Sequence, residues 1–520
     1  MSHYQQGMTV GGLVLRTLQR WGDRVAFSGH GGVVTYAQAY DQIGRMQAAL
    51  TAAGARRGQR VALLTANRAA GWLAANAVQA LGLATTALHP LGSVDDQLDV
   101  LNDAECNFMV VDVDAFAERG GELSGRAGSA LEQVFTLGHA PYGIDLHAAA
   151  AAAGAVSPVL DCGPEDEALL AYTGGTTGKS KGVLRRQPSA IAVTAAILSD
   201  FEWPTDVTYL AVAPNSHVGG TKVLPTLIRG GRVHCLHGFD PERVLDAIQR
   251  ERISVALLVP TMIYLLLDHP KLEATDLSSL ELLMYGASPM SPTRLMEGLE
   301  RIGPVFSQLY GQTEGYPISV LRRGDHDAAN PALFASCGHP CSSVRVALLD
   351  GEDRPVAPGD AGEICVRAPQ VMDGYWQRPE QNAETLANGW LHTGDMATAD
   401  ERGYLYIVDR KKDMIVSGGF NVFPREVEDV LSSHPDVAMA AVIGIPDEKW
   451  GEAVKAVVVP RPGATVDAAE LIAMVREKKG AAHAPKSVDF AEAIPLTAIG
   501  KPDKKALRAG YWQGRDRKVG

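Results

Sequence analysis

Residues 172–183 have the sequence YTGGTTGKSKGV, a glycine-rich stretch that partly matches the phosphate-binding P-loop. It contains Gly178-Lys179-Ser180, as a P-loop does. A P-loop also needs its first glycine at position 173, where this chain has Thr173. It continues straight into a helix, whereas Gly182 and Pro188 follow here. The spacing therefore argues against a P-loop.

The composition of the loop still suits a phosphate. Its glycines leave backbone N–H groups free to approach an anion, and its threonines and Lys179 and Lys181 add hydroxyl donors and charge. It follows the β-rich run ALLAYT at 168–173, and α/β proteins bind ligands where strands end. The alternative interpretation is a mobile surface turn.

Short β-rich runs alternate with amphipathic helical stretches over the first part of the chain, which predicts an α/β domain of stacked, mainly parallel sheets. The runs include 60–66, 108–112, 207–214, 232–237 and 255–260. Strands separated by Gly- and Pro-rich turns at 340–408 predict a small antiparallel or barrel-like unit. A helix from Pro424, strands near 438–443 and 453–459, and a helix at 467–479 predict a compact α+β domain. The expected boundary is the charged turn after residue 409, giving domains 1–409 and 410–520.

Composition and charge indicate which binding partners and which cellular location to expect. The formal net charge of −12 argues against a nucleic-acid-binding surface, and no block of five like charges indicates an interaction tail. The six cysteines are scattered and are expected to be reduced. The N-terminal stretch MSHYQQGMTVGG has no signal pattern, and the most apolar run, 253–267, is too short to span a bilayer. A cytoplasmic protein without a membrane span is expected.

Four further motifs follow the loop in order. They are YGQTEG at 310–315, LHTGD at 391–395, DRKKDMIVSGGFNVFPREVE at 409–428 and PLTAIGKPDKKAL at 495–507. Singly, each has a simple explanation: Glu314 as a solvated acid, Asp395 as a helix cap on a turn, Lys501 as a surface lysine. The occurrence of all five motifs together, in this order, is hard to obtain by chance.

With these motifs, nearly the whole chain resembles the AMP-forming adenylating enzymes: acyl-CoA synthetases, nonribosomal-peptide adenylation domains and luciferases. It is most similar to bacterial acyl-CoA synthetases of the fatty-acid type. The resemblance implies a large N-terminal domain and a small mobile C-terminal domain. It also implies the substrates ATP and coenzyme A, with Mg²⁺. A carboxylate first forms an acyl-adenylate and releases pyrophosphate, and a thiol then displaces AMP after the C-terminal domain has rotated.

The resemblance assigns nucleotide contacts by position. The β- and γ-phosphates would contact Thr173, Gly174, Gly175, Thr176, Thr177, Gly178 and Lys181. The adenine pocket would be lined by Gly286, Ala287, Ser288, Tyr310, Gly311 and Gln312. Thr313 would donate to the α-phosphate, Glu314 would bind Mg²⁺, and Asp395 and Arg410 would hold the ribose hydroxyls.

The remaining assignments concern chemistry and the second step. Lys501 would contact the reacting carboxylate and α-phosphate, His217 would border the acyl group, and Lys412 falls at the hinge. The expected catalytic residues are thus Lys501, His217, Glu314 and Thr173. For coenzyme A, the resemblance implies Gly418 and Gly419 in the pantetheine tunnel, with Trp450 and Lys486 as further contacts.

Two departures from the family loop leave alternatives open. Gly174 stands where the family has Ser, and Ser180 where it has Pro. The lost hydrogen bond to a charged phosphate is worth roughly 1.5–3 kcal/mol, so adenylation is the half-reaction most affected. The chain is therefore predicted to be an AMP-forming acyl-CoA ligase for a bulky or long apolar acid.

The alternatives are thioester formation from a supplied acyl-adenylate, acyl transfer to a carrier protein in trans, or nucleotide binding without turnover. A homodimer is also an open possibility.

Overall fold

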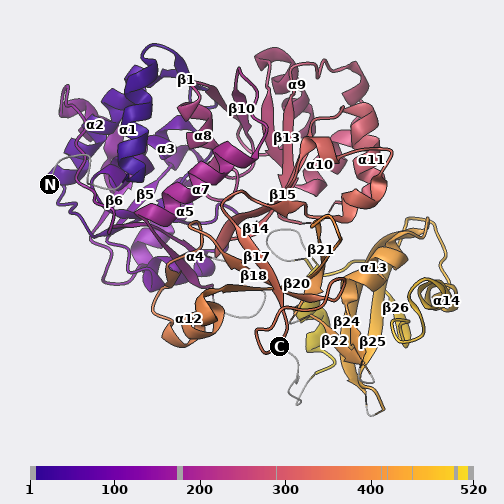
Figure 1. Ribbon diagram of the computed structural model, residues 1–520. Coiled ribbons are helices and arrows are strands. Elements are labelled where there is room, and N and C mark those ends of the chain that lie inside the picture. Colours follow the sequence, from indigo (N-terminus) through magenta and orange to yellow (C-terminus); the bar gives the residue numbers. More distant parts are fainter. Residues whose placement is uncertain are drawn as a thin grey trace. The chain divides into compact units, whose positions relative to one another are not determined.

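The computed structural model describes residues 8–172, 180–288, 290–411, 413–417, 420–447, 449–496 and 502–512 (Figure 1). By their internal packing the described residues divide into two compact units. The first unit takes in the chain up to 172, then 180–345 and 366–391, and the second takes in 346–365 and the described chain from 392 on. The boundary at residue 409 concerns functional domains and stays a prediction.

The first unit contains two sheets with mainly parallel strands, as predicted. The first sheet has the order β19-β9-β8-β4-β3-β5-β6-β7 and the second β16-β15-β14-β13-β12-β10-β11-β1-β2. The strands of the first sheet are β3 (Arg60–Leu64), β4 (Ala84–Ala87), β5 (Phe108–Val111), β6 (Gln133–Thr136), β7 (Ile144–Asp145), β8 (Glu167–Tyr172), β9 (Gly182–Arg186) and β19 (Gly374–Tyr375). Those of the second are β1 (Val25–Gly29), β2 (Val34–Thr35), β10 (Thr208–Ala211), β11 (Arg232–Cys235), β12 (Val255–Leu258), β13 (Leu282–Gly286), β14 (Phe306–Gln312), β15 (Gly315–Leu321) and β16 (His339–Pro340).

Helices connect these strands and cover both faces of each sheet. They are α1 (Val10–Trp21), α2 (Tyr36–Ala52), α3 (Ala69–Ala80), α4 (Val94–Asp103), α5 (Val113–Arg126), α6 (Leu146–Ala152), α7 (Gln187–Asp200), α8 (Val223–Ile228), α9 (Pro241–Glu251), α10 (Pro260–Leu267), α11 (Pro292–Arg301) and α12 (Pro379–Thr385). Their starts follow from local chemistry. Thr35 and Gln38 form a capping box at α2, and Asp240 caps α9 ahead of a proline.

The core shows why the strands read as continuous apolar runs. Val61 and Leu63 of β3 join a cluster that contains residues of both sheets and of α1, α2, α3, α7 and α8, so these helices lie between the sheets. Ala62 and Leu64 face the opposite way and pack with α4 and α5. On the far face of the second sheet, α9, α10 and α11 gather beside β13 (Figure 1). Because successive side chains alternate and both faces are covered, most positions of these strands are apolar.

The second unit contains two smaller sheets. The small sheet has the order β17-β18-β20-β21, and the C-terminal sheet has the order β23-β22-β25-β24 with β26 beside β25. The strands are β17 (Arg345–Leu349), β18 (Gly362–Arg367), β20 (Leu391–Ala399), β21 (Leu405–Arg410), β22 (Ile415–Ser417), β23 (Phe420–Val422), β24 (Val437–Asp447), β25 (Gly451–Pro460) and β26 (Ser487–Phe490). The helices are α13 (Pro424–Ser432), α14 (Ala468–Lys479) and α15 (Lys504–Ala509).

One local prediction is wrong. Asp395 was expected on a turn, but it lies inside β20, where it pairs with Arg410 of β21. Gly394 interrupts the pattern of β20 and looks like a turn signal in the sequence, yet the strand continues to Ala399 because β21 pairs along it.

The structure bears on two further expectations, the state of the cysteines and the presence of a membrane-spanning helix. All six cysteines are free thiols, as expected. None of the described helices is both long enough and apolar enough to cross a bilayer.

Two helical glycines provide a matched test of this packing. A Cβ at Gly44 of α2 would lie 2.0 Å from the backbone oxygen of Val156, whereas a Cβ at Gly125 of α5 meets no atom of the described chain within 4 Å. We expect Gly44→Ala to lower the free energy of unfolding by about 2 kcal/mol, because backbone must move. Gly125→Ala should raise it by about 0.5–1 kcal/mol, because alanine loses less entropy on folding. Denaturant unfolding checks both signs, and equal effects would contradict the packing described.

Candidate active site

The glycine-rich loop joins two antiparallel strands of the first sheet. Tyr172 at the end of β8 pairs with Gly182 at the start of β9, and α7 begins only at Gln187. A P-loop would lead from its strand directly into a helix. The prediction that this loop is not a P-loop is therefore confirmed. Residues 173–179 lie outside the described residues, and with them the predicted phosphate contacts Thr173, Gly174, Gly175, Thr176, Thr177 and Gly178.

Two predicted adenine segments lie next to each other because β13 and β14 are parallel. Gly286 at the carboxyl end of β13 pairs with Leu309 of β14. Ala287 and Ser288 therefore leave the sheet beside Tyr310, Gly311 and Gln312, which end β14. A Cβ at Gly286 would lie 2.3 Å from the Leu309 backbone oxygen, so only glycine fits. Ala287 has a φ of 63°, which turns the chain sharply at this edge.

The next two predicted residues form a tight turn. Thr313 and Glu314 connect β14 to antiparallel β15, with Gln312 paired to Gly315. The Tyr375 hydroxyl donates a 2.8 Å hydrogen bond to Glu314 Oε1. Lys181 Nζ lies 4.9 Å from the centre of the same tyrosine ring. Tyr375 thus links the predicted metal ligand to the predicted phosphate-binding lysine, and burial, followed by the charge of Glu314, raises the pKa of its hydroxyl.

A buried arginine holds the backbone of this turn in place. Arg185 of β9 donates a 2.7 Å hydrogen bond to the Thr313 carbonyl and a second bond to the Gln370 carbonyl. Burial lowers the pKa of Arg185 to about 10, and the nearby carboxylates of Asp373 and Glu314 only partly offset this effect. The guanidinium therefore stays charged at pH 7. Neither Arg185 nor Tyr375 was predicted from the sequence. Their only signal is an arginine facing inward on a strand and a tyrosine after a turn, which does not identify a partner.

His217 lies on the segment that leaves the carboxyl end of β10, on the same sheet as β13 and β14. Its ring meets the His89 ring edge-on with 4.4 Å between centroids, and the Ser216 hydroxyl lies 2.8 Å from Nδ1. Partial desolvation by the surrounding protein, followed by the nearby His89, lowers the pKa of His217, although its side chain is exposed to solvent. His217 is therefore neutral at pH 7 and can donate or accept a hydrogen bond without bringing charge.

Lys222 is a third residue that was not predicted from the sequence. It is fully buried, and its Nζ contacts the hydroxyls of Thr221 and Tyr316. Burial lowers its pKa to about 7. Lys222 therefore connects the segment after His217 to the strand that follows Glu314, and its charge there is marginal at neutral pH.

In the second unit, the two predicted ribose contacts are neighbours. Asp395 and Arg410 occupy paired positions on β20 and β21, and Arg410 Nε lies 3.3 Å from Asp395 Oδ1. Asp395 is buried to 7% exposure while Arg410 is about half exposed. The buried carboxylate of Asp395 thus has a half-exposed guanidinium as its ion-pair partner.

The second unit also brings two predicted coenzyme A contacts together. Lys486 Nζ lies 5.0 Å from the Trp450 ring centre, and Lys449 Nζ lies 4.9 Å from it. Trp450 precedes Gly451, which pairs with Ser417 at the end of β22. The predicted residues Lys412, Gly418, Gly419 and Lys501 lie outside the described residues.

Comparison with known families shows the class of protein to which the chain belongs. Residues 14–376 match the model of the AMP-binding enzyme family. Residues 426–501 match the model of the AMP-binding enzyme C-terminal domain. The first match alone covers more than half of the chain, and the enzyme class predicted from the sequence, an AMP-forming acid–thiol ligase, is confirmed at that level.

Individual relatives agree with the family models. The chain is 46% identical to the medium/long-chain fatty-acid–CoA ligase FadD8 of Mycobacterium tuberculosis, over 94% of this chain and 87% of that protein. It is 38% identical to a feruloyl-CoA synthase of Amycolatopsis, over 93% of this chain and 95% of that protein. The solved amide bond synthetase McbA of Marinactinospora thermotolerans is similar with a TM-score of 0.89 and 36% identity, covering 97% of this chain and all of that one. The chain therefore belongs to the AMP-binding enzyme family, the AMP-forming adenylating enzymes, within its acyl-CoA ligase group.

Proposed function

We propose that this protein activates a bulky or long apolar carboxylic acid with ATP and transfers the acyl group to coenzyme A. The observation that carries the proposal is the arrangement where the ends of β13 and β14 in the second sheet lie beside Lys181 and Tyr375 of the first sheet. There, the adenine segment at 286–288 adjoins Tyr310, and Glu314 shares Tyr375 with Lys181. The family uses ATP, and its ligases use coenzyme A, so this region is proposed as the nucleotide site.

In the proposed first step, a carboxylate oxygen of the acid attacks the α-phosphorus of ATP, and pyrophosphate leaves. Negative charge builds up on the phosphate oxygens, so positioned cations and hydrogen-bond donors lower the barrier. Lys181 and the loop at 173–178 are proposed for the outer phosphates, Thr313 for the α-phosphate, and Lys501 for the reacting oxygens. Arg185 keeps Thr313 in place through its backbone carbonyl.

Glu314 suits the divalent cation that the family implies. Its carboxylate is partly buried, and the Tyr375 hydroxyl orients one of its oxygens. Carboxylate oxygens and phosphate oxygens are the ligands that Mg²⁺ prefers. We propose that Glu314 holds Mg²⁺, which would neutralise charge on the ATP phosphates.

The acid is proposed to lie between the segment at 217–220 and the segment at 285–288. Their residues are mostly small, which leaves volume for a large acyl group. Neutral His217 at this place avoids attracting a second carboxylate, because its depressed pKa keeps it uncharged at pH 7. The names of the two curated relatives, a fatty-acid ligase and a feruloyl-CoA synthase, support long-chain and aromatic acids as the first candidates.

In the second step, the coenzyme A thiolate attacks the acyl carbonyl carbon and AMP leaves with the bonding electron pair. We propose that Trp450 and Lys486 bind the nucleotide end of coenzyme A, with Gly418 and Gly419 beside the pantetheine arm. An indole face stacks on an adenine, and a lysine pairs with phosphate.

A different acceptor is the second candidate. McbA, which aligns over nearly this whole chain, is an amide bond synthetase, so an amine is an alternative to the thiol in step two. Transfer to a carrier protein and use of a supplied acyl-adenylate remain further alternatives. The acceptor is decided by offering coenzyme A, amines and a carrier protein to the same acyl-adenylate.

The central experiment separates the half-reactions. A panel of fatty, aromatic and polycyclic acids is incubated with ATP, Mg²⁺ and coenzyme A, and AMP and acyl-CoA are measured by mass. With the best acid, we expect pyrophosphate exchange in the wild type and a loss of at least about 100-fold in Lys501→Ala, since a lysine at the reacting oxygens stabilises developing charge. Lys505→Ala is the control, because Lys505 is an exposed lysine nearby in sequence. Unchanged exchange in Lys501→Ala would contradict the mechanism.

The Tyr375 hydroxyl provides a finer test of the first step. Tyr375→Phe removes one hydrogen bond to the Glu314 carboxylate, so we expect the KM for Mg–ATP to rise about tenfold with little change in unfolding midpoint. Tyr142→Phe is the control, because it removes a hydroxyl that donates to the Ala117 carbonyl instead. Equal KM values for both variants would show that Tyr375 does not act through Glu314.

The pair of lysines at Trp450 tests the second step. We expect Lys486→Ala to raise the KM for coenzyme A about tenfold and to leave pyrophosphate exchange unchanged, because one charge-assisted contact to phosphate is lost. Lys449→Ala is a matched control, since Lys449 lies equally close to the same ring. A larger effect at Lys449 than at Lys486 would show that the assignment is reversed.

A further inference from the structure

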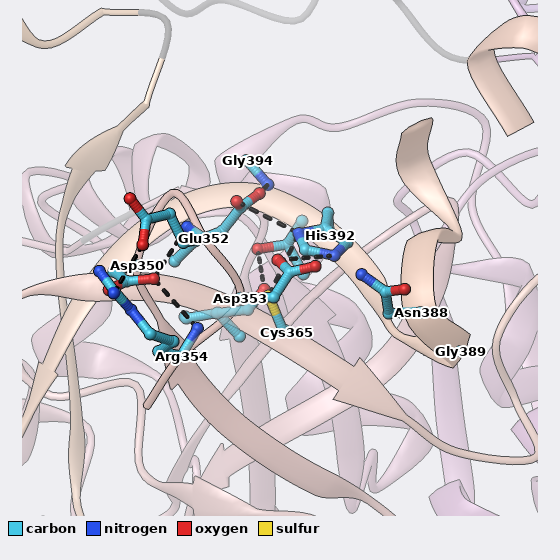
Figure 2. A network of polar contacts seen from close by, with 12 residues as sticks. Asp350, Glu352, Asp353, Arg354, Cys365, Asn388, Gly389, His392 and Gly394 are labelled. Carbon is cyan, nitrogen blue, oxygen red and sulfur yellow. Dashed lines mark hydrogen bonds and ion pairs between the residues drawn. The ribbon is translucent and has the colours of Figure 1, made fainter. Parts of the chain in front are cut away.

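We propose that Glu363, Cys365 and His392 form a binding site for a zinc-type divalent cation in the small sheet of the second unit. Glu363 and Cys365 are two residues apart on β18 and therefore face the same side of the strand. His392 lies on the neighbouring strand β20. One ligand atom from each residue lies within 4.8 Å of the other two. Figure 2 shows Cys365 and His392 side by side, with Asp353 next to them.

The distances around the histidine suit tetrahedral coordination. Cys365 Sγ and Glu363 Oε2 each lie 3.4 Å from His392 Nδ1. In a tetrahedral zinc site, metal–ligand bonds of about 2.0–2.3 Å place neighbouring ligand atoms about 3.4–3.6 Å apart. Two of the three edges already have this length, so a cation needs only small side-chain rotations. A fourth coordination position would be left for water.

Groups outside the three ligands hold them in position. The Gly394 N–H donates a 2.8 Å hydrogen bond to Glu363 Oε1, which leaves Oε2 directed at the histidine. Asp353 Oδ1 lies 3.7 Å from His392 Nε2. Within the described residues, this buried nitrogen has no hydrogen-bond partner. A carboxylate behind a histidine places the proton on the outer nitrogen and frees the inner one for a metal. Asp353 is thus proposed as the positioning residue for Nδ1.

The three ligand atoms, a thiol sulfur, an imidazole nitrogen and a carboxylate oxygen, indicate which metal ion the site would bind. A thiolate and an imidazole suit zinc and cobalt, whereas Mg²⁺ prefers oxygen ligands throughout. Zinc binds the thiolate form of cysteine, so binding would release the thiol proton to water as the sulfur–metal bond forms.

In this structure the ammonium group of Lys411 forms an ion pair with the cluster. Its Nζ lies 3.1 Å from Glu363 Oε2, and its side chain is about half exposed. It can therefore swing into solvent when a metal takes its place. The metal would then tie β18 to β20, the strand that carries Asp395.

Metal titration of the full-length protein tests this site without any assay of activity. After removal of bound metal by a chelator, Co²⁺ is added and the thiolate-to-cobalt charge-transfer absorption is followed. Zn²⁺ affinity is then measured in competition with a chromophoric chelator. We expect one equivalent per chain. Cys365→Ser should abolish the charge-transfer absorption, and His392→Asn should abolish the stoichiometric binding. Asp353→Asn should weaken Zn²⁺ binding about 10- to 100-fold.

Two variants control for adventitious binding. Cys162→Ser removes a more accessible thiol, and His434→Asn removes another histidine of the second unit that lies 3.5 Å from a carboxylate. Both should bind Co²⁺ as the wild type does. X-ray absorption of the zinc-loaded wild type should show one sulfur with nitrogen and oxygen ligands, which keeps the test valid if a variant fails to fold. No stoichiometric binding by the wild type, a sulfur-free metal environment, or loss of binding in Cys162→Ser would overturn the proposal.

Discussion

The pairing of Gly286 with Leu309 is the constraint on which the candidate nucleotide site depends. Parallel β13 and β14 end at the same edge of the second sheet, so the two segments that follow them must adjoin. The backbone oxygen of Leu309 leaves no room for a side chain at position 286. A larger residue would push the strands apart and separate 287–288 from Tyr310, although neither segment would itself have changed.

Buried polar groups hold the rest of this edge rigid. Arg185 binds the carbonyl of Thr313, and Tyr375 binds the carboxylate of Glu314. A charged guanidinium inside a protein is costly unless its donors are satisfied, and here carbonyls take up the bonds. The turn at 313–314 is thus positioned from both its backbone and its side chain.

The small sheet of the second unit serves two sets of side chains. Asp395 and Arg410 pair across β20 and β21, while Glu363, Cys365 and His392 gather across β18 and β20. Gly394 links the sets, because its N–H binds Glu363 and its carbonyl accepts from the backbone of Lys411. A cation at the Cys–His–Glu cluster would therefore bind to the same strand that carries Asp395.

The sequence by itself determined the fold class, the family and the order of the motifs. Apolar periodicity specifies strands and helices locally, and the five ordered motifs predict the enzyme class through their resemblance to the AMP-forming adenylating enzymes. Only the tertiary structure decided that Asp395 lies in a strand, that Tyr375 joins Glu314 to Lys181, and that Arg185 supports Thr313. These contacts join residues far apart in the chain, such as Glu314 and Tyr375. Their pairing depends on strand order and register, which no local pattern encodes.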